Sequence, residues 1–454
     1  MNAREIIKQP TQGALAERIL RPFQEFAHTG ASSGILLLIC TIIALIWANS
    51  PWAASYNALW DLHLRIGIGS VGLDEPLHIW INDGLMTIFF FVVGLEIKRE
   101  VLVGELSSLR QAILPIVAAV GGMLCPALIY LAFNRGTSAA GGWAIPMATD
   151  IAFSLGVLAL LGSRIPSALK VFLTAFAIVD DIGAVLVIAI FFHSTINITA
   201  LIASGIILIC VALANVIGVQ KPLVYALLGV CLWVAMLLSG LHATIAGILL
   251  ALLIPSRARI DIRAFVRRGR TCLDEVASDE RPGIGLFMNE RQQSAIQALE
   301  TAAEHSLTPL QRMEHTTHPW VAFAIVPLFV LANAGVPISS NFFAALLSPI
   351  GLGIILGLII GKQVGIMLFS WLTVKLGWAT LPEGTAWRQM YGVSWVGAIG
   401  FTMALFINGL AFGDAGQELF FSEAKSAILV AALIAGVVGW LLLRFSKPGS
   451  ASAE

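Results

Sequence analysis

Charged side chains are scarce in this sequence: Asp, Glu, Lys and Arg together make up 12% of its 454 residues. Soluble globular domains contain about 25%, so the shortage excludes a soluble fold, which could not bury so much apolar surface. Basic and acidic residues balance at 27 each, which gives no sign of the basic surface that nucleic-acid binding needs. Hydrophobic residues make up 58% of the chain. We therefore predict an all-α membrane protein with no nucleic-acid partner.

Cysteine is also rare, and its five occurrences share no metal-type or paired spacing. This pattern argues against a zinc site and against a disulfide framework. Four of the five lie in apolar runs. We interpret these four as small buried hydrophobic residues.

Long apolar runs are the dominant feature of the chain. A helix needs about 20 apolar residues to cross about 30 Å of hydrocarbon, and we count twelve candidate spans. The first run starts at Ser33 without a small-residue cleavage site, and residues 1–30 lack an apolar core, so we expect an uncleaved span rather than a signal peptide. The predicted spans are 33–49, 78–97, 112–133, 143–162, 166–192, 197–217, 222–238, 240–255, 319–337, 349–375, 389–412 and 423–445.

Basic residues set the orientation of these spans. With the N-terminus in the cytoplasm, the external loops hold only Arg65, Arg135 and Lys425, Lys362 lies within a span, and all other Lys and Arg are cytoplasmic. We expect a multi-pass protein of the inner membrane with both termini cytoplasmic. The predicted domains are a cytoplasmic N-terminal segment at 1–32, membrane domains at 33–255 and 319–445, a long cytoplasmic loop at 256–318 and a cytoplasmic tail at 446–454.

Two loops have distinctive patterns. The external connection 50–77 contains alternating residues and glycines from His63 to Gly69, which favour a short hairpin. The loop 256–318 begins with six arginines between Arg257 and Arg270 and then turns acidic. Its basic part is suited either to contact with anionic lipid head groups or to a solvated linker that follows the positive-inside rule. Residues 289–304 are expected to form a short surface helix.

Four ionisable residues fall near the middle of predicted spans, where a charge costs about 2.5–3.5 kcal/mol on insertion scales. Asp150 lies in span 4, Asp180 and Asp181 in span 5, and Lys362 in span 10. At 1.5 Å per residue all four come within a few ångströms of the midplane. Asp180 and Asp181 are adjacent on a helix and point about 100° apart, so they cannot perform the same role.

Three acids and one base at one depth indicate a binding site. Lys362 can neutralise one carboxylate, while burial and repulsion between carboxylates favour the protonated form of the others. Such a site binds either a proton or a small hard cation, which prefers oxygen ligands. The competing interpretation is a buried structural ion pair, which leaves two aspartates unexplained.

The backbone near Asp150 carries a second signal. Pro146 lacks an N–H and leaves a carbonyl group four residues earlier without its helical partner. Span 11 has Gly397, Gly400 and Thr402 close to its centre. Broken spans in two halves of a chain are typical of a transporter site, whereas each feature taken alone also fits an ordinary kink.

Charged residues also gather at predicted cytoplasmic span ends. Span 2 ends with Glu96, Lys98, Arg99 and Glu100, and Glu314 begins the run Glu-His-Thr-Thr-His before span 9. These are either ordinary interfacial charges or a cluster that titrates near neutrality and controls access. His242, at the outer end of span 8, fits an interfacial anchor better than a sensor.

At this point the sequence is identified as resembling the NhaA-type sodium/proton antiporter family. The resemblance covers nearly the whole membrane portion in the right order, and the combination of ATD, DD and GK is highly specific. The matching segments are FFFVVGLEIKRE (89–100), GWAIPMATDIAFSLGVLALLG (142–162), AIVDDIGAV (177–185), SGLHATIAG (239–247), HPWVAFAIVPLFVLANAGV (318–336), IIGKQVGI (359–366) and GAIGFTMALFI (397–407).

The resemblance implies a fold of about twelve helices with two inverted repeats, a family feature rather than a pattern visible in this sequence. It also implies that spans 4 and 11 are discontinuous and cross at the site. Asp181 resembles the essential ion-binding aspartate, Asp180 its partner, and Lys362 the lysine that pairs with Asp180. Thr149 and Asp150 correspond to the polar residues at the crossing, where Asp150 compensates the charge of helix ends.

Further family properties follow as expectations. Glu96, Arg99, Glu100 and Glu314 resemble a cytoplasmic pH-sensing cluster, and His242 a residue that affects the pH response. The expected activity is electrogenic, pH-regulated extrusion of Na⁺ or Li⁺ in exchange for H⁺ across a bacterial inner membrane. No cofactor is implied, and Asp180 and Asp181 would bind the transported Na⁺. The external loop 56–72 would form a β-hairpin at a homodimer interface.

The loop 256–318 is longer than in compact members of the family, which leaves the pH range open. Three alternatives remain: another ion coupling in the same fold, an intramembrane aspartyl protease and a passive channel. The protease would need a Gly-x-Gly-Asp motif at a span and gives Lys362 no role. Nothing in the sequence resembles the selectivity filter of a channel.

Overall fold

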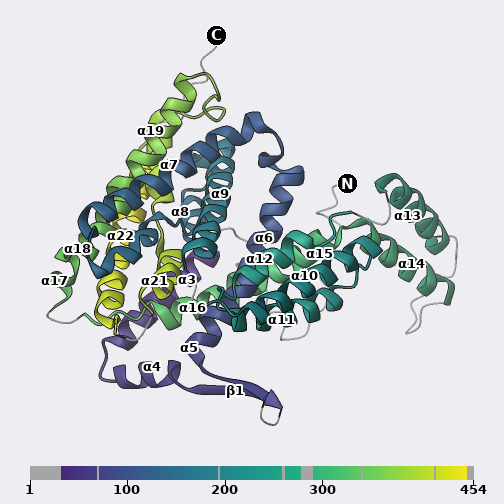
Figure 1. Ribbon diagram of the computed structural model, residues 1–454. Coiled ribbons are helices and arrows are strands. Elements are labelled where there is room, and N and C mark those ends of the chain that lie inside the picture. The colour runs from purple at the N-terminus through teal and green to yellow at the C-terminus, as the bar shows by residue number, and fades with distance from the viewer. Residues whose placement is uncertain are drawn as a thin grey trace. The chain divides into compact units, whose positions relative to one another are not determined.

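The structure, a computed structural model, describes residues 32–68, 71–192, 195–257, 261–277, 290–338, 341–413 and 416–446. These residues are nearly all helical (Figure 1). They form two compact units, which are described separately. The first comprises Met1–Ile81, Glu105–Val187 and Val326–Glu454, and the second Asn82–Gly104 and Ile188–Ile325.

The first unit contains the four ionisable residues predicted near mid-membrane. Its helices include α7 and α19, which pack along each other, and α22, which contacts α18 and α20. Its elements are α3 (Ser32–Ala48), α4 (Ala53–Trp60), β1 (His63–Ile68), β2 (Val71–Pro76), α5 (Leu77–Ile79), η2 (Glu105–Ser107), α7 (Leu109–Asn134), η3 (Ser138–Met147), α8 (Ile151–Leu161), η4 (Gly162–Arg164), most of α9 (Ser167–Phe191), α16 (Val326–Asn333), α17 (Phe342–Leu347), α18 (Pro349–Leu356), η6 (Gly357–Gly361), α19 (Lys362–Lys375), α20 (Trp387–Gly397), α21 (Phe401–Phe412) and α22 (Glu418–Arg444).

The second unit is built around the pairs α6–α12 and α10–α11. Its elements are most of η1 (Trp80–Leu85), α6 (Met86–Val103), α10 (Ile198–Ile217), α11 (Pro222–Ser239), α12 (Ile245–Leu253), α13 (Ile262–Ala277), α14 (Glu290–Ser306), α15 (Pro309–Trp320) and η5 (Val321–Ile325).

Among the described residues, nine helices are long and apolar enough to cross a membrane, or up to eleven if each of two bent pairs is one span. The bent pairs are α3 with α4, at 115°, and α20 with α21, at 43°. The predicted span 240–255 contains only the nine-residue helix α12. The all-α membrane fold is therefore confirmed, while the exact number of twelve spans stays a prediction.

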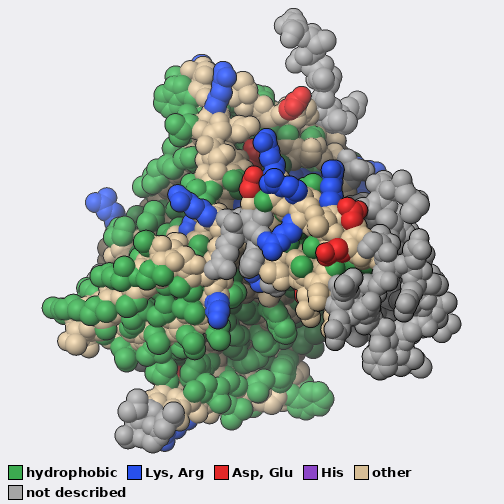
Figure 2. All heavy atoms as spheres, turned by 90° about the vertical axis from the view of Figure 1, so that its right-hand side faces the viewer, with side chains coloured by type: hydrophobic (Ala, Val, Ile, Leu, Met, Phe, Trp, Pro, Cys, Tyr) green, Lys and Arg blue, Asp and Glu red, His purple; other side chains and the backbone are tan. Residues whose placement is uncertain are grey.

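Apolar side chains cover much of the surface, as expected for helices that face lipid. Figure 2 shows a face on which hydrophobic side chains predominate, with most Lys and Arg in the upper half of the view. Cys210 on α10 and Cys231 on α11 are exposed, so the prediction that the cysteines of apolar runs are buried is wrong for these two. In a membrane protein, an apolar side chain is as favourable in contact with lipid as in the protein core.

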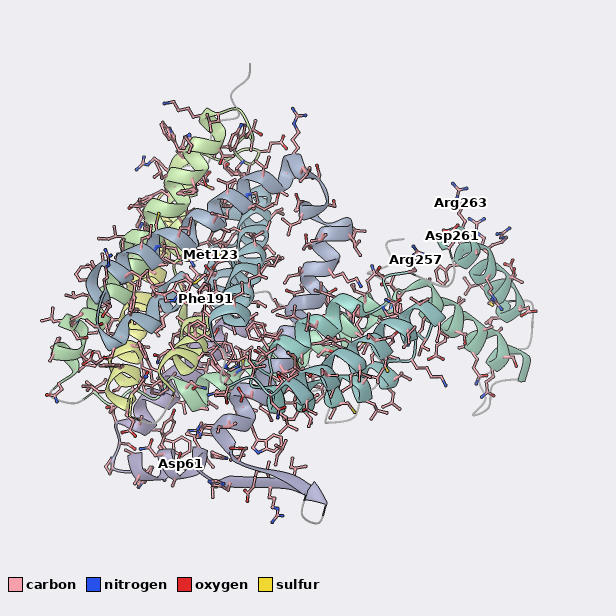
Figure 3. The ribbon with its side chains drawn as sticks, in the orientation of Figure 1. Asp61, Met123, Phe191, Arg257, Asp261 and Arg263 are labelled. Carbon is pink, nitrogen blue, oxygen red and sulfur yellow. The ribbon has the colours of Figure 1, made fainter. Side chains whose placement is uncertain are left out.

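Two loop predictions hold. Residues His63–Ile68 pair with Val71–Pro76 in an antiparallel hairpin in which Leu64 lies opposite Glu75 and Ile66 opposite Leu73. The expected surface helix at 289–304 is α14. The helix α13 was not expected; it packs on α14, and Asp261 and Arg263 lie at its start (Figure 3).

Glycine lets α19 approach α7 closely enough to fix the position of Lys362. A Cβ atom added at Gly365 would lie 2.0 Å from the carbonyl oxygen of Gly121 on α7, so no side chain fits there. The π-helical turn η6 directly precedes Lys362, and such turns are frequent at functional sites. Lys362 is thus set on a helix whose distance from α7 is defined by backbone contact.

Candidate functional site

Span 4 is broken at the residues predicted from sequence. The 3₁₀-helical segment η3 ends at Met147, the residues from Ala148 to Asp150 are not helical, and α8 begins at Ile151. Pro146 lies at the end of η3, where a missing N–H and a fixed φ work against a continuous helix. Span 11 is interrupted in the same way between α20 and α21.

The two interruptions lie against each other. The main-chain N–H of Asp150 donates to the carbonyl oxygen of Ile399 at 2.7 Å, and the Thr149 hydroxyl donates to that of Gly397 at 2.7 Å. A Cβ atom added at Gly400 would lie 2.7 Å from the carbonyl oxygen of Ala148. Only glycine therefore allows this crossing of backbone against backbone.

The Asp150 carboxylate serves the N-terminal ends of two half-helices at once. One oxygen accepts from the N–H of Phe153 on α8 at 3.0 Å, and the other from the N–H and hydroxyl of Thr402 on α21, at 2.9 and 2.5 Å. Helix N-termini carry partial positive charge, so a single carboxylate that is 1% exposed neutralises both ends.

Donors from neighbouring helices satisfy the opposite, C-terminal ends. The ammonium group of Lys362 donates to the carbonyl oxygen of Met147, the last residue of η3. At the end of α20, the carbonyl oxygen of Val396 accepts from the Ser154 hydroxyl at 2.8 Å, and that of Ser394 from the Gln363 amide at 3.2 Å. The last carbonyl groups of a helix lack the usual N–H partner four residues further on, and that of Val396 also accepts from the N–H of Ile399 at 3.2 Å. Side chains from neighbouring helices therefore add to the hydrogen bonds at these helix ends.

Asp180 and Lys362 form a buried ion pair beside this crossing. The Lys362 Nζ lies 3.0 Å from Asp180 Oδ2, and both side chains are 0% exposed. The hydroxyl and main-chain N–H of Thr149 lie close to the same carboxylate. Asp180 Oδ1 has no hydrogen-bond partner among the described residues. The predicted pairing is therefore confirmed, and it leaves acceptor capacity on Asp180 unused.

Asp181 occupies the next position on α9 and is 1% exposed. It is close enough to Lys362 to interact with its charge. Two residues further along α9, Gly183 packs against Met123 of α7 (Figure 3), which brings this stretch of α9 against α7. Asp180 and Asp181 thus share one lysine in a buried region, where the charge of each group affects the others.

Comparison of the sequence with known protein families identifies the family of this chain. The sequence matches the profile of the family described as Na⁺/H⁺ antiporter 1 over residues 24–443. This chain belongs to the Na⁺/H⁺ antiporter 1 family. Similar proteins include the Na⁺/H⁺ antiporter NhaA of Oleidesulfovibrio alaskensis, 49% identical with 94% of both chains covered. The Na⁺/H⁺ antiporter NhaA of Koribacter versatilis is 50% identical over 94% of this chain and 92% of the relative. That of Acidithiobacillus ferrooxidans is 48% identical over 96% of this chain and 100% of the relative.

In this member of the antiporter family, the charges predicted at the cytoplasmic mouth do form a cluster, which lies within the second unit. The Arg99 guanidinium contacts the carboxylates of Glu314 and of Glu100, the latter at 3.0 Å. His318 Nε2 lies 3.8 Å from Glu96 Oε1. Glu314 is only 8% exposed, so removal of Arg99 would leave its carboxylate poorly compensated.

His242 does not join this cluster. It lies in the turn before α12, whereas the carbonyl oxygen of Leu252, at the other end of that helix, accepts from Lys98 at 2.7 Å. The helix between them has nine residues, a rise of about 14 Å. His242 and the cluster are thus separated by the length of α12.

Sequence reasoning missed several partners. Thr402 was noted in span 11 but not as the partner of Asp150, and Ser154 follows Asp150 by one helical turn. Gln363 had the clearest signal, because a polar residue in the middle of a span is a functional candidate. No three His, Cys, Asp or Glu side chains of the described part of the chain gather closely enough to hold a metal ion.

Proposed function

We propose that the chain is a secondary active antiporter that extrudes Na⁺ or Li⁺ in exchange for H⁺. The observation that carries this proposal is the buried Asp180–Lys362 pair beside Asp181, at the crossing of two interrupted spans. The family and the names of the relatives support the same activity.

Exchange follows from competition at these carboxylates. Na⁺ is a hard cation that prefers oxygen ligands, and a carboxylate that has bound a proton offers it none of its negative charge. Because the three acids are not gathered around one point, the ion requires further oxygen atoms, from hydroxyl groups, main-chain carbonyl groups or water. Asp181 and Asp180 bind the ion in this proposal, and Thr149 is placed to assist.

Lys362 makes the exchange electrogenic in this proposal. A sodium ion that binds Asp180 competes with the Lys362 ammonium for the same carboxylate. If the lysine releases its proton as the ion arrives, and Asp181 releases another, two protons exchange for each sodium ion. Asp150 stays with the helix ends, where its hydrogen bonds already occupy both oxygens.

The cluster around Arg99 is proposed to regulate transport by pH. It comprises Arg99, Glu96, Glu100 and Glu314, with His318 nearby, and a change in protonation within it changes the electrostatic field at the proposed cytoplasmic mouth. His242 is proposed to act separately. We also propose that the chain lies in a bacterial inner membrane with both termini cytoplasmic, and that it forms a homodimer through the external loop 56–72, which contains β1 and the start of β2.

Everted membrane vesicles from cells that lack other antiporters test the activity. A respiratory proton gradient, followed with a pH-sensitive dye from about pH 6 to 9, should collapse on addition of Na⁺ or Li⁺. The Na⁺ concentration for half-maximal response should rise as pH falls, because protons then occupy the carboxylates more often. Asp181→Asn should abolish the response.

Asp61→Asn is the matched control. Asp61 lies outside the site (Figure 3), and its side chain is 72% exposed, so the same substitution there should leave exchange unchanged. A response to K⁺ alone would indicate a different ion coupling in the same fold. Full activity in Asp181→Asn would remove Asp181 from the ion-binding role.

A further inference from the structure

Gln363 directly follows Lys362 on α19 and contacts a different part of the site. Neighbouring residues of a helix point about 100° apart. The Lys362 ammonium donates to the carbonyl oxygen of Met147, at the C-terminal end of η3. The Gln363 amide donates instead to the carbonyl oxygen of Ser394, in the last turn of α20, at 3.2 Å. Two consecutive residues of one helix therefore contact the C-terminal ends of both half-helices that precede the crossing.

The contact between Gln363 and Ser394 consists of two hydrogen bonds that run in opposite directions. Besides the bond from the Gln363 amide, the Ser394 hydroxyl donates to the amide oxygen of Gln363. Gln363 is 6% exposed and Ser394 1% exposed, so water does not readily replace either bond. Breaking such a buried pair is costly, because it leaves polar groups without a partner. The pair thus holds the start of α19 to the end of α20.

The Ser394 hydroxyl also has a second acceptor within reach. Its oxygen lies 2.7 Å from the carbonyl oxygen of Tyr391, on the same helix. A hydroxyl group has a single proton to donate, so the two acceptors compete for it. The hydroxyl can therefore turn to Tyr391 without being left unsatisfied, while the Gln363 amide keeps its bond to the carbonyl oxygen of Ser394. A contact of this kind can adjust as two helices shift and still keep them joined.

The end of α20 is held from two sides, and these sides differ in what they connect. Ser154 of α8 donates to the carbonyl oxygen of Val396 at 2.8 Å, which joins α20 to the second half of the other interrupted span. Gln363 joins it to the helix that carries Lys362, the residue paired with Asp180. A change at the ion pair can reach α20 by this short route, because Lys362 and Gln363 are neighbours on one backbone.

We propose that Gln363 is a positioning residue that makes α20 follow the movement of Lys362 during transport. The inference rests on the proposed exchange, in which an arriving ion competes with Lys362 for Asp180. When Lys362 changes its partners, the start of α19 shifts, and the buried pair of hydrogen bonds carries the end of α20 with it. The side-chain hydrogen bonds that join Gln363 to other described residues go to Ser394, so its loss should slow the movement and leave the affinity for the ion intact.

Hydrogen–deuterium exchange of the full-length protein in detergent tests the contact without reference to transport. Gln363→Met keeps the length of the side chain and removes both hydrogen bonds. The main-chain N–H groups of Ala398 and Ile399, which bond to the last turn of α20, should then exchange about tenfold faster, the change expected when two buried hydrogen bonds are lost together. Ser394→Ala, which removes one of the two bonds, is an independent second variant and should give a smaller increase.

Thr373→Val is the matched control on the same helix. Thr373 is 1% exposed, and its hydroxyl donates to the carbonyl oxygen of Phe369 within α19 at 2.7 Å. The substitution removes a buried hydrogen bond inside α19, so deuterium exchange at the end of α20 should equal that of the parent. Equal increases in Thr373→Val and Gln363→Met would indicate a general loosening of α19 and would overturn the proposed contact.

Proteoliposomes measure the consequence for transport. With rates expressed per folded protein, Gln363→Met should lower the maximal rate of Na⁺/H⁺ exchange about tenfold. The Na⁺ concentration for half-maximal rate should stay within about twofold of the parent, because uniform binding of the ion is unchanged. Ser394→Ala should lower the maximal rate less, and it should add nothing in the Gln363→Met background, since the two residues act as one unit. Thr373→Val should exchange at the rate of the parent.

Three kinetic results would overturn the proposal. A raised half-saturation concentration for Na⁺ at an unchanged maximal rate would make Gln363 part of the ion site instead. A lower unfolding midpoint in Gln363→Met with both kinetic constants unchanged would leave Gln363 a structural role only. Additive losses in the double variant would show that it acts through a partner other than Ser394. If the parent itself moves no cation, the proposed function fails and the transport role of Gln363 with it, whereas the deuterium measurement still decides whether Gln363 holds the end of α20.

Discussion

At the scale of single residues, charged side chains of the site lie at the ends of helices and compensate the partial charges there. Asp150 meets two N-terminal ends, and Lys362 meets the C-terminal end of η3 as well as Asp180. A lysine with two buried partners gains from both, because each stabilises its charged form. Removal of Lys362 therefore affects an ion pair and a helix end together.

Lys362→Ala should lower stability as well as exchange. It leaves Asp180 buried without its cation, and breaking a buried pair by removal of one partner costs about 3–5 kcal/mol. Thermal unfolding in detergent should show a clear fall in the midpoint. Lys375→Ala on the same helix is the control: Lys375 is exposed and lies 4.5 Å above the Trp371 ring, so its loss should cost about 1 kcal/mol or less. An unchanged midpoint in Lys362→Ala would contradict the role of the pair.

At the scale of elements, the crossing depends on two half-helices that approach closely. Pro146 and the glycines of span 11 indicated an interruption or an ordinary kink, because these residues act on their own backbone, and the family resemblance implied the interruption. The contact between the two half-helices could not be predicted from these residues, since a hydrogen bond from Asp150 to Ile399 joins segments about 250 residues apart, and nothing local in either segment encodes it. Only the resemblance to a known family supplied that link.

Gly400→Ala tests the closeness of this contact. The added methyl group would lie 2.7 Å from the carbonyl oxygen of Ala148, and overpacking of this kind costs about 1–3 kcal/mol. We expect a lower unfolding midpoint and weaker exchange. Gly409→Ala, on α21, should be neutral or slightly stabilising, because its Cβ meets nothing within 4 Å and alanine favours helix. Equal effects of the two substitutions would show that helix propensity, rather than close contact at the crossing, determines the change in unfolding midpoint and exchange.

At the scale of the whole molecule, composition was enough to predict most of the helices, but it did not give every helix its correct length. Scarce charge and long apolar runs predicted the helices, yet span 240–255 came out as the short helix α12. A turn through Gly240, which has a φ of +82°, takes up the start of that run. Hydropathy alone does not distinguish a turn of small residues from a helix, which explains why the helix is shorter than the predicted span.

We propose that the hairpin joins two copies of the chain. Within the described residues it is a sheet of two strands, so each strand has one edge without a strand partner, and Leu64 and Ile66, on one face, are 42% and 56% exposed. Ile66→Asp should therefore shift the protein from dimer to monomer in size-exclusion chromatography with light scattering. Ile338→Asp, at a residue 61% exposed in the loop after α16, should not. Since the site lies within one chain, the Ile66→Asp monomer should still exchange Na⁺ for H⁺ in proteoliposomes. A persistent dimer would place the interface elsewhere, and an inactive monomer would show that the hairpin contributes to transport as well as to assembly.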